Sequence, residues 1–348
     1  MGENAKLLKS LLRFDCFSIG KTKKMMFPDV KSTGNLVARG NNSGNSHQEK
    51  HYYHAKKNKK ILIAQMHPGT RTTSYSSSSF SSSLQKLAKQ PTDYTVLCCY
   101  DGLVLLWYYN DHLLWNPSTN ELVQLPNHEF PDASSTTYGL GYDSTSDDYK
   151  ILMLHNRSFS CRPLNKILAL KCGSSRIIYN HPHGFRHRMG PEDGEFHWLC
   201  VNDLSKYFMI SFNISNEVYG EISLPEGICS ISYRVEVTCG VSVLEGMLCA
   251  YCTCPGDTEE GTFKLWVMKE YGVKESWTKL FTIRDTHLVF TIPKYMLADG
   301  EVLLFYRKGL YNNGFRTSKG PFELLPAGRF YIGGFVYTES LISLKLLI

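Results

Sequence analysis

The chain has 348 residues, enough for one large domain or two smaller ones, and 43% of them are hydrophobic. Its net charge of +6 is uneven, because residues 1–60 hold thirteen Lys and Arg against four Asp and Glu, whereas residues 61–348 hold twenty-five against twenty-eight. A near-neutral body argues against nucleic-acid binding by the main domain, and the absence of a long apolar run argues against a membrane partner.

The first sixty residues divide into two parts. Residues 4–19 place Leu8, Leu11, Leu12 and Cys16 at helical spacing, which predicts one short amphipathic helix that packs on the body or on a partner. Residues 20–60 are polar and basic, which predicts a solvated linker, with nuclear targeting as the alternative for the lysines at 56–60.

Two segments follow before the main β region. Residues 61–64 predict a short strand. Eight serines within residues 74–83 predict a long flexible surface loop.

From residue 94 the pattern is continuous β structure. Strands at 95–99 and 103–109 flank a tight turn, and a hairpin at 113–126 has Asn116-Pro117 at the end of its first arm. Three later hairpins share this layout, at 167–178, 208–225 and 262–283, and a weaker one is predicted at 302–326. In the 262–283 hairpin, Gly272 supplies the turn, and Trp266 and Trp277 are predicted to pack between repeats.

The hairpins recur at the spacing of propeller blades. Successive anchors are 55, 42, 54 and 45 residues apart, and they are Trp115, Leu170, Phe212, Trp266 and Tyr311. These spacings surround the period of about 40–50 residues that propeller blades show, whereas a β-sandwich would not explain them. We expect the ring to close by pairing residues 61–64 with residues 339–346.

An ordered series of motifs resembles the plant F-box-associated domain over residues 92–346. The series includes LWNPSTNE at 114–121, GLGYD at 139–143, FHW at 196–198, ISFNI at 210–214 and LWVMKEYGV at 265–273. It is most similar to the S-locus F-box and F-box/kelch-repeat proteins, whose members are substrate receptors of SCF-type ubiquitin ligases. In that family the F-box docks on a Skp-family adaptor of the cullin complex, and the kelch-like domain holds the target.

The resemblance implies an all-β fold, a kelch-like β-propeller preceded by a short helical F-box remnant. The expected divisions are a partial F-box helix at 4–19, a basic linker at 20–60 and a propeller-like domain at 61–346. Residues 9–18 resemble the second half of an F-box, and the family's first helix is not found before them. Adaptor contacts are expected from Leu8, Leu11, Leu12 and Phe14, on a reduced surface.

The implied function is recognition of a protein target for an SCF-type ligase. The alternative is a binding module or decoy that is no longer coupled to the ligase. Candidate target contacts come from a His/Arg-rich loop and an acidic loop, which could select oppositely charged partners: His183, Arg186, His187, Glu259 and Glu260. The loops expected to form this surface are 128–137, 156–165, 180–193 and 255–261.

Residues with catalytic or metal-binding potential have simpler interpretations. Cys249, Cys252 and Cys254, with the histidines near 181–187, suggest zinc, but buried thiols and an exposed loop explain them better. His197 beside a tryptophan is expected to be a core histidine. No phosphate loop, nucleophile elbow or zinc-protease motif is present, so we expect no cofactor and no enzymatic activity. An odd count of eleven cysteines in a long chain favours a cytoplasmic or nuclear protein.

Overall fold

The structure is a computed structural model. It describes residues 59–67, 72–78, 85–87, 91–126, 130, 136–155, 165–178, 186–187, 195–201, 206–228, 238–255, 261–284, 289–297, 299–308, 311–318, 320–322 and 330–348. The predicted helix at 4–19 and the predicted linker up to residue 58 lie outside these ranges.

Six antiparallel sheets of four strands each make up the described fold. We name them blades A to F in ring order and give the strands of each from first to fourth. Blade A has β24 (Phe330–Thr338), β1 (Lys59–Met66), β2 (Thr73–Ser78) and β3 (Gln85–Lys86). Blade B has β4 (Thr95–Tyr100), β5 (Leu103–Tyr108), β6 (Asp111–Asn116) and β7 (Glu121–Gln124), and blade C has β8 (Thr136–Asp143), β9 (Asp148–His155), β10 (Asn165–Ala169) and β11 (Ser174–Ile178).

The other three blades follow the same order. Blade D has β12 (Arg186–His187), β13 (Glu195–Val201), β14 (Tyr207–Asn213) and β15 (Val218–Ile222). Blade E has β16 (Thr238–Leu244), β17 (Met247–Pro255), β18 (Gly261–Met268) and β19 (Trp277–Arg284). Blade F has β20 (Val289–Met296), β21 (Val302–Lys308), β22 (Tyr311–Arg316) and β23 (Gly320–Phe322). Two 3-10 turns complete the described elements, η3 (Lys274–Ser276) and η4 (Leu344–Leu346).

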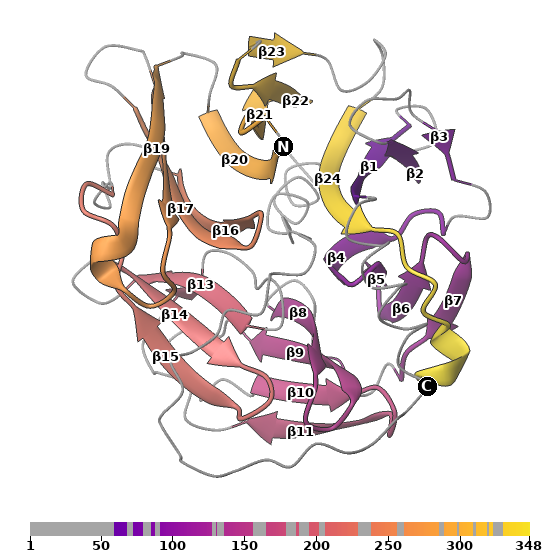
Figure 1. The fold of residues 1–348 in the computed structure, drawn as a ribbon. Helices are drawn as coiled ribbons and strands as arrows, with labels where there is room; N and C mark the ends of the chain where they lie inside the picture. The colour runs from indigo at the N-terminus through magenta and orange to yellow at the C-terminus, as the bar shows by residue number, and fades with distance from the viewer. Residues whose placement is uncertain are drawn as a thin grey trace, which may run out of the picture.

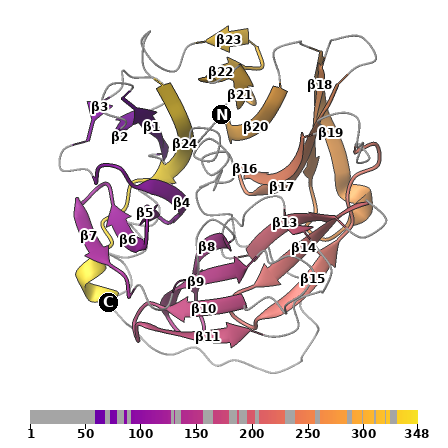
Figure 2. The same cartoon turned by 180° about the vertical axis from the view of Figure 1, so that it is seen from behind.

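The blades form a closed ring (Figure 1), and the view from behind shows the same circle (Figure 2). First strands of neighbouring blades touch, since β4 contacts β24 and β8, and β20 contacts β16 and β24. Buried apolar clusters run from blade A through B to C, from C to D, from D through E to F, and from F back to A. The fold is therefore the predicted β-propeller, and radial closure leaves only short edges exposed.

Packing between blades explains why the strands are apolar on both faces. In β18, Phe263 and the four residues from Leu265 to Met268 are all buried, although their side chains alternate between the two faces of the sheet. Each blade lies between two others, so each face of a strand has a neighbouring blade to pack against. The predicted role of the tryptophans is confirmed at Trp277, whose indole N–H donates to the carbonyl of Ser223 beyond β15 in blade D, at 2.8 Å.

The five predicted anchors mark successive third strands, as the spacing argument requires. Trp115, Phe212, Trp266 and Tyr311 lie on β6, β14, β18 and β22, and Leu170 directly follows β10. A residue with backbone in the left-handed region follows each of the first four strands: Asn120, Gly173, Glu217 and Gly272, with φ of 58°, 60°, 59° and 78°. Blades B, C and D thus repeat a four-residue turn with a left-handed last residue, whereas the β18–β19 connection of blade E is longer and contains η3.

The predicted partner for ring closure is wrong. Strand β1 pairs with β24, for example Ile61 with Val336, and not with residues 339–346. Those residues come after β24 and cross the edge of blade B, where η4 contacts β6 and β7. We call residues 339–346 the strap. Strand pairing needs extended backbone with free ladder groups, and β24 offers nine such residues, whereas the strap ends in the turn η4.

The strap is fixed to blade B by two residues of the LWNPSTNE motif. The Asn116 amide donates to the carbonyls of Ser340 and Ile342 at 3.1 and 2.8 Å. The Glu121 carboxylate accepts the backbone N–H of Leu344 at 2.6 Å, and Leu344 is fully buried. These motif residues therefore belong to the closure of the ring.

The predicted serine-rich loop is wrong at its start. Residues 73–78 form β2, which pairs with β1 and β3, and Ser74, Ser76 and Ser77 are buried. Small hydroxyl side chains fit between packed strands when they find partners, and Ser77 Oγ lies 2.9 Å from the Tyr337 hydroxyl. Residues 79–83 lie outside the described part of the chain.

Candidate functional site

Strand order gives the ring two different faces. Because neighbouring strands are antiparallel, connections from first to second and from third to fourth strand leave one edge of each blade. We call this edge the turn face, and its described turns include 101–102, 117–120, 144–147, 170–173, 214–217 and 245–246. Connections from second to third strand and from blade to blade leave the opposite edge, which we call the loop face.

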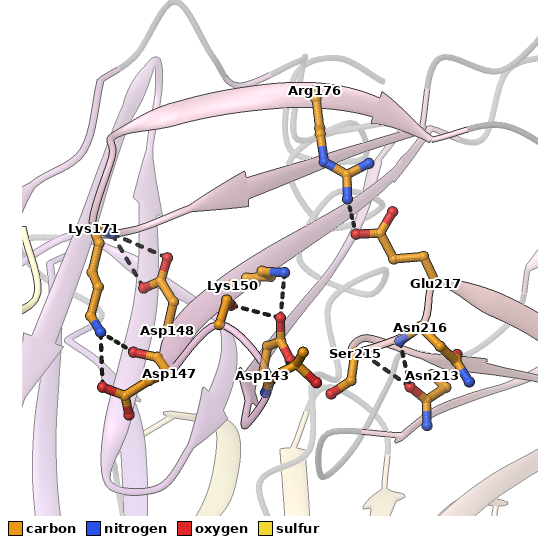
Figure 3. Close-up of polar contacts among 12 residues, drawn as sticks. Asp143, Asp147, Asp148, Lys150, Lys171, Arg176, Asn213, Ser215, Asn216 and Glu217 are labelled. Carbon is orange, nitrogen blue, oxygen red and sulfur yellow. Dashed lines mark hydrogen bonds and ion pairs between the residues drawn. The ribbon is translucent and has the colours of Figure 1, made fainter.

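The turn face of blade C carries a network of ion pairs (Figure 3). Asp143, at the end of β8, is buried, and its carboxylate accepts from the Lys150 ammonium and the Ser146 hydroxyl, both at 2.6 Å. Burial would raise the pKa of Asp143, but these hydrogen bonds, with one from the Thr145 N–H, hold that pKa well below its usual range. The carboxylate is therefore a fixed structural anion that organises the β8–β9 turn.

Two further polar pairs join neighbouring blades. The Arg176 guanidinium on β11 of blade C pairs with the Glu217 carboxylate in the β14–β15 turn of blade D. The Tyr149 hydroxyl donates to the Asp101 carboxylate in the β4–β5 turn of blade B at 2.6 Å. Burial, followed by the nearby Asp101 charge, raises the pKa of Tyr149. These two pairs thus connect blade C to blades D and B.

A different surface lies on the loop face of blade B. Tyr109 is 76% exposed at the β5–β6 turn, and its ring centroid is 4.6 Å from that of Tyr108. The Tyr108 ring is in turn 5.5 Å from Tyr94, which precedes β4. The Trp107 indole N–H donates to the Tyr109 carbonyl, so a fourth aromatic residue supports the turn.

Two carboxylates accompany this aromatic surface. Burial raises the pKa of Tyr94, and the charge of Asp111 raises it further. Burial also raises the pKa of Tyr108, and the charge of Asp93 contributes a smaller increase. We call Asp93, Tyr94, Trp107, Tyr108, Tyr109 and Asp111 together the Tyr109 patch. One signal for it is visible in the sequence, three consecutive aromatic residues at 107–109 followed by Asn110 and Asp111, but the pattern predicts a strand through residue 109.

Most of the residues predicted to contact the adaptor or the target lie outside the described ranges. Leu8, Leu11, Leu12 and Phe14 lie outside the described residues, as do His183, Glu259 and Glu260. Arg186 and His187 lie on β12 and pair with Val201 and Cys200, so this part of the predicted loop is the first strand of blade D. The structure does not bring the predicted target contacts together as one described surface.

Three of the four predicted target-binding loops connect strand ends on the loop face. Segment 128–137 joins β7 to β8, segment 156–165 joins β9 to β10, and segment 255–261 joins β17 to β18. Segment 180–193 contains β12 and so reaches both edges of blade D. The loop face is therefore the edge that carries these three connections and the Tyr109 patch.

The histidine and the cysteines considered as catalytic or zinc-binding residues lie in blades D and E. His197 is buried on β13, and its Nε2 lies 2.9 Å from the Tyr271 hydroxyl of blade E, as expected for a core histidine. Cys249 and Cys252 are buried on β17, with Cys252 Sγ 3.8 Å from Cys254 Sγ. Within the described ranges, no three His, Cys, Asp or Glu side chains are grouped to hold a metal ion. Over the same ranges no helix has the length and apolarity to cross a membrane.

Comparison with protein families gives a match over most of the chain. A family profile described as "F-box associated beta propeller domain" matches residues 21–311. The F-box protein CPR1 of Arabidopsis thaliana is 28% identical over 204 residues, which cover 50% of this chain and 48% of that protein. An F-box/kelch-repeat protein of the same plant is 30% identical over 228 residues, covering 62% of this chain and 60% of that protein. The chain thus matches about half to three fifths of the length of these relatives.

Solved structures are similar at much lower sequence identity. TolB from Acinetobacter baumannii has a TM-score of 0.49 at 10% identity, covering 83% of this chain and 71% of that one. Aleuria aurantia lectin has a TM-score of 0.42 at 11% identity, covering 77% of this chain and 97% of that one.

Proposed function

The chain belongs to the F-box-associated β-propeller family, and on this premise we propose that it is the target-recognition subunit of an SCF-type E3 ubiquitin ligase. Its partners would be a Skp-family adaptor with its cullin complex and a protein target bound at the loop face. Proteins of this family are generally adaptors rather than enzymes. We extend that role to this chain, acting in the cytoplasm or the nucleus.

The observation that carries the proposal is the separation of the two faces. The chain enters the ring at Lys59, on the turn face, where the Lys59 ammonium pairs with Glu245 at 2.7 Å and lies 5.0 Å from the centre of the Tyr295 ring. Residues 1–58, with the candidate adaptor contacts, are thus joined to the ring at the turn face. Three of the predicted target-binding loops and the Tyr109 patch are presented at the opposite edge, where a rigid scaffold can offer them to a target.

Two carboxylates of the turn face have structural surroundings rather than catalytic ones. A general base or nucleophile needs an unengaged group with a pKa suited to its task. Here the Asp143 carboxylate is held ionised by several donors, and Glu301 is engaged by Arg316 and the Ser318 N–H. These two groups stabilise turns.

The test is co-purification of the full chain with a Skp-family adaptor expressed alongside it. We expect a stoichiometric complex that Leu11→Glu disrupts, because a charge on the apolar side of the predicted helix opposes burial against the adaptor. Lys9→Ala is the matched control, since it lies on another side of the same segment and should leave the complex intact. Melting curves of each variant check that the propeller is folded.

Absence of adaptor from a folded preparation would refute ligase coupling. The chain would then be a binding module without a ligase, the alternative that the sequence also allows. Ubiquitin transfer to a captured target in the reconstituted complex would complete the positive result.

A further inference from the structure

Two left-handed backbone positions meet in the Tyr109 patch. Tyr109 has φ of 49° and Asp93 has φ of 72°, both in the left-handed region that favours glycine. A bulky aromatic residue at a positive φ in a two-residue hairpin turn is unfavourable, since Gly, Asn and Asp are the residues that such turns select. The Tyr109 ring is 76% exposed, so packing within the propeller does not compensate for this strain.

The backbone of the patch is nevertheless held in place by hydrogen bonds. The Trp107 indole donates to the Tyr109 carbonyl, and the Tyr75 hydroxyl of blade A donates to the Tyr94 carbonyl. Backbone hydrogen bonding ties Asp93 to Thr73 at 3.3 Å, and the Asp93 carboxylate accepts the Thr73 N–H at 3.2 Å. An exposed aromatic surface on a backbone that is fixed before binding loses less entropy when a partner docks, which favours its use as an interface anchor.

The charge of the patch indicates what it would bind. Asp93 and Asp111 lie close enough to the tyrosines to raise their pKa values, although burial is the larger cause. A tyrosine face next to a carboxylate attracts a cation in two ways, through the ring quadrupole and through ion pairing, and guanidinium does both best. An acidic or purely apolar partner would leave these carboxylates opposed or desolvated.

We propose that the Tyr109 patch is a target-contact site that binds an Arg- or Lys-bearing segment of the recognised protein. The inference rests on the proposed function, because it assigns the target side of that role to one place on the loop face. The guanidinium or ammonium group lies against the Tyr108 and Tyr109 rings and pairs with Asp93 or Asp111. This contact is separate from the predicted His/Arg-rich and acidic loops.

The experiment selects ligands without knowing the target. A library of random dodecapeptides is panned on the full folded chain, and binding of the recovered peptides is measured by fluorescence polarisation at two salt concentrations. We expect enrichment of Arg and Lys, weaker binding at high salt and at least tenfold weaker binding to Tyr109→Gly. The melting temperature of Tyr109→Gly should be equal or higher, because glycine adopts the positive φ without strain.

Two further variants separate the causes. Asp111→Asn should weaken binding of the same peptides severalfold, since it removes the negative charge of the side chain and keeps its shape. Val218→Ser is the matched control, because Val218 is 58% exposed near the turn face and its loss should leave peptide binding unchanged.

Several results would overturn the assignment. These are recovery of no peptide, recovered peptides without excess Arg or Lys, and equal binding to Tyr109→Gly. A concentration-dependent dimer that Tyr109→Gly abolishes would show that a second copy occupies the patch. Loss of adaptor co-purification with peptide binding intact would instead refute the ligase role and leave the patch assignment standing.

Discussion

Replacing Asn116 with alanine should destabilise the ring more than the same change at Asn213. Both side chains form the same local turn, with the amide oxygen accepting the N–H two residues later at 2.9 Å. Only Asn116 also donates to the strap, at the carbonyls of Ser340 and Ile342. Each such hydrogen bond contributes about 1 kcal/mol net, and a buried carbonyl left without its donor adds further cost. We therefore expect Asn116→Ala to lower the free energy of unfolding by about 2–3 kcal/mol more than Asn213→Ala.

Urea unfolding of the full chain, followed by tryptophan fluorescence and by circular dichroism, measures this difference. Coincident transitions from the two probes establish that a single free energy is defined for the ring. Limited proteolysis adds a local readout, since release of the strap should expose residues near Ile342 before the ring unfolds. Equal losses for the two alanine variants would show that the strap does not stabilise the ring through Asn116.

Two other changes test the same packing from different directions. Gly102→Ala should lower the free energy of unfolding in urea more than Gly173→Ala does. A Cβ at Gly102 would lie 2.3 Å from Ser340 Cβ, whereas a Cβ at Gly173 meets nothing within 4 Å. Both residues have positive φ, so equal losses of stability would contradict the contact with the strap. His112 is buried against Phe130, and burial lowers its pKa to about 4, with a backbone hydrogen bond opposing the shift. As the pH falls, His112 is protonated in the unfolded chain before it is protonated in the folded one. The free energy of unfolding should therefore decline by about 3 kcal/mol from roughly pH 6.5 to roughly pH 4. An equally steep dependence of the melting temperature on pH in His112→Gln would exclude His112 as the cause.

The third strands of the blades could be predicted from the sequence because their signals are local. An aromatic or apolar strand end followed by Asn, Ser and Gly defines both the strand and its turn within about ten residues. The anchors Trp115, Phe212 and Trp266 were found in this way, and the structure confirms their strands.

First strands and ring closure were harder to predict. Pro293 argues against a strand, yet β20 accommodates it beside register shifts, where a missing ladder N–H has no cost. The pairing of β1 with β24 joins residues about 270 apart, and no local pattern reports it. The Tyr109 patch was missed because its geometry depends on a two-residue turn at residues 109–110 and on Thr73 of another blade.

Closure by β24 has a consequence for synthesis on the ribosome. Blades B to F are each made from one continuous stretch of chain, so each can form its sheet soon after its last strand emerges. Blade A cannot, because β1 must wait for Phe330–Thr338 before its inner edge is paired. Throughout translation the nascent protein therefore carries an open β edge at residues 59–66, which is a template for intermolecular pairing. A chain that stops before residue 330 keeps that edge unpaired, and it should aggregate or depend on chaperones even though five of the six sheets in the described part of the protein are complete.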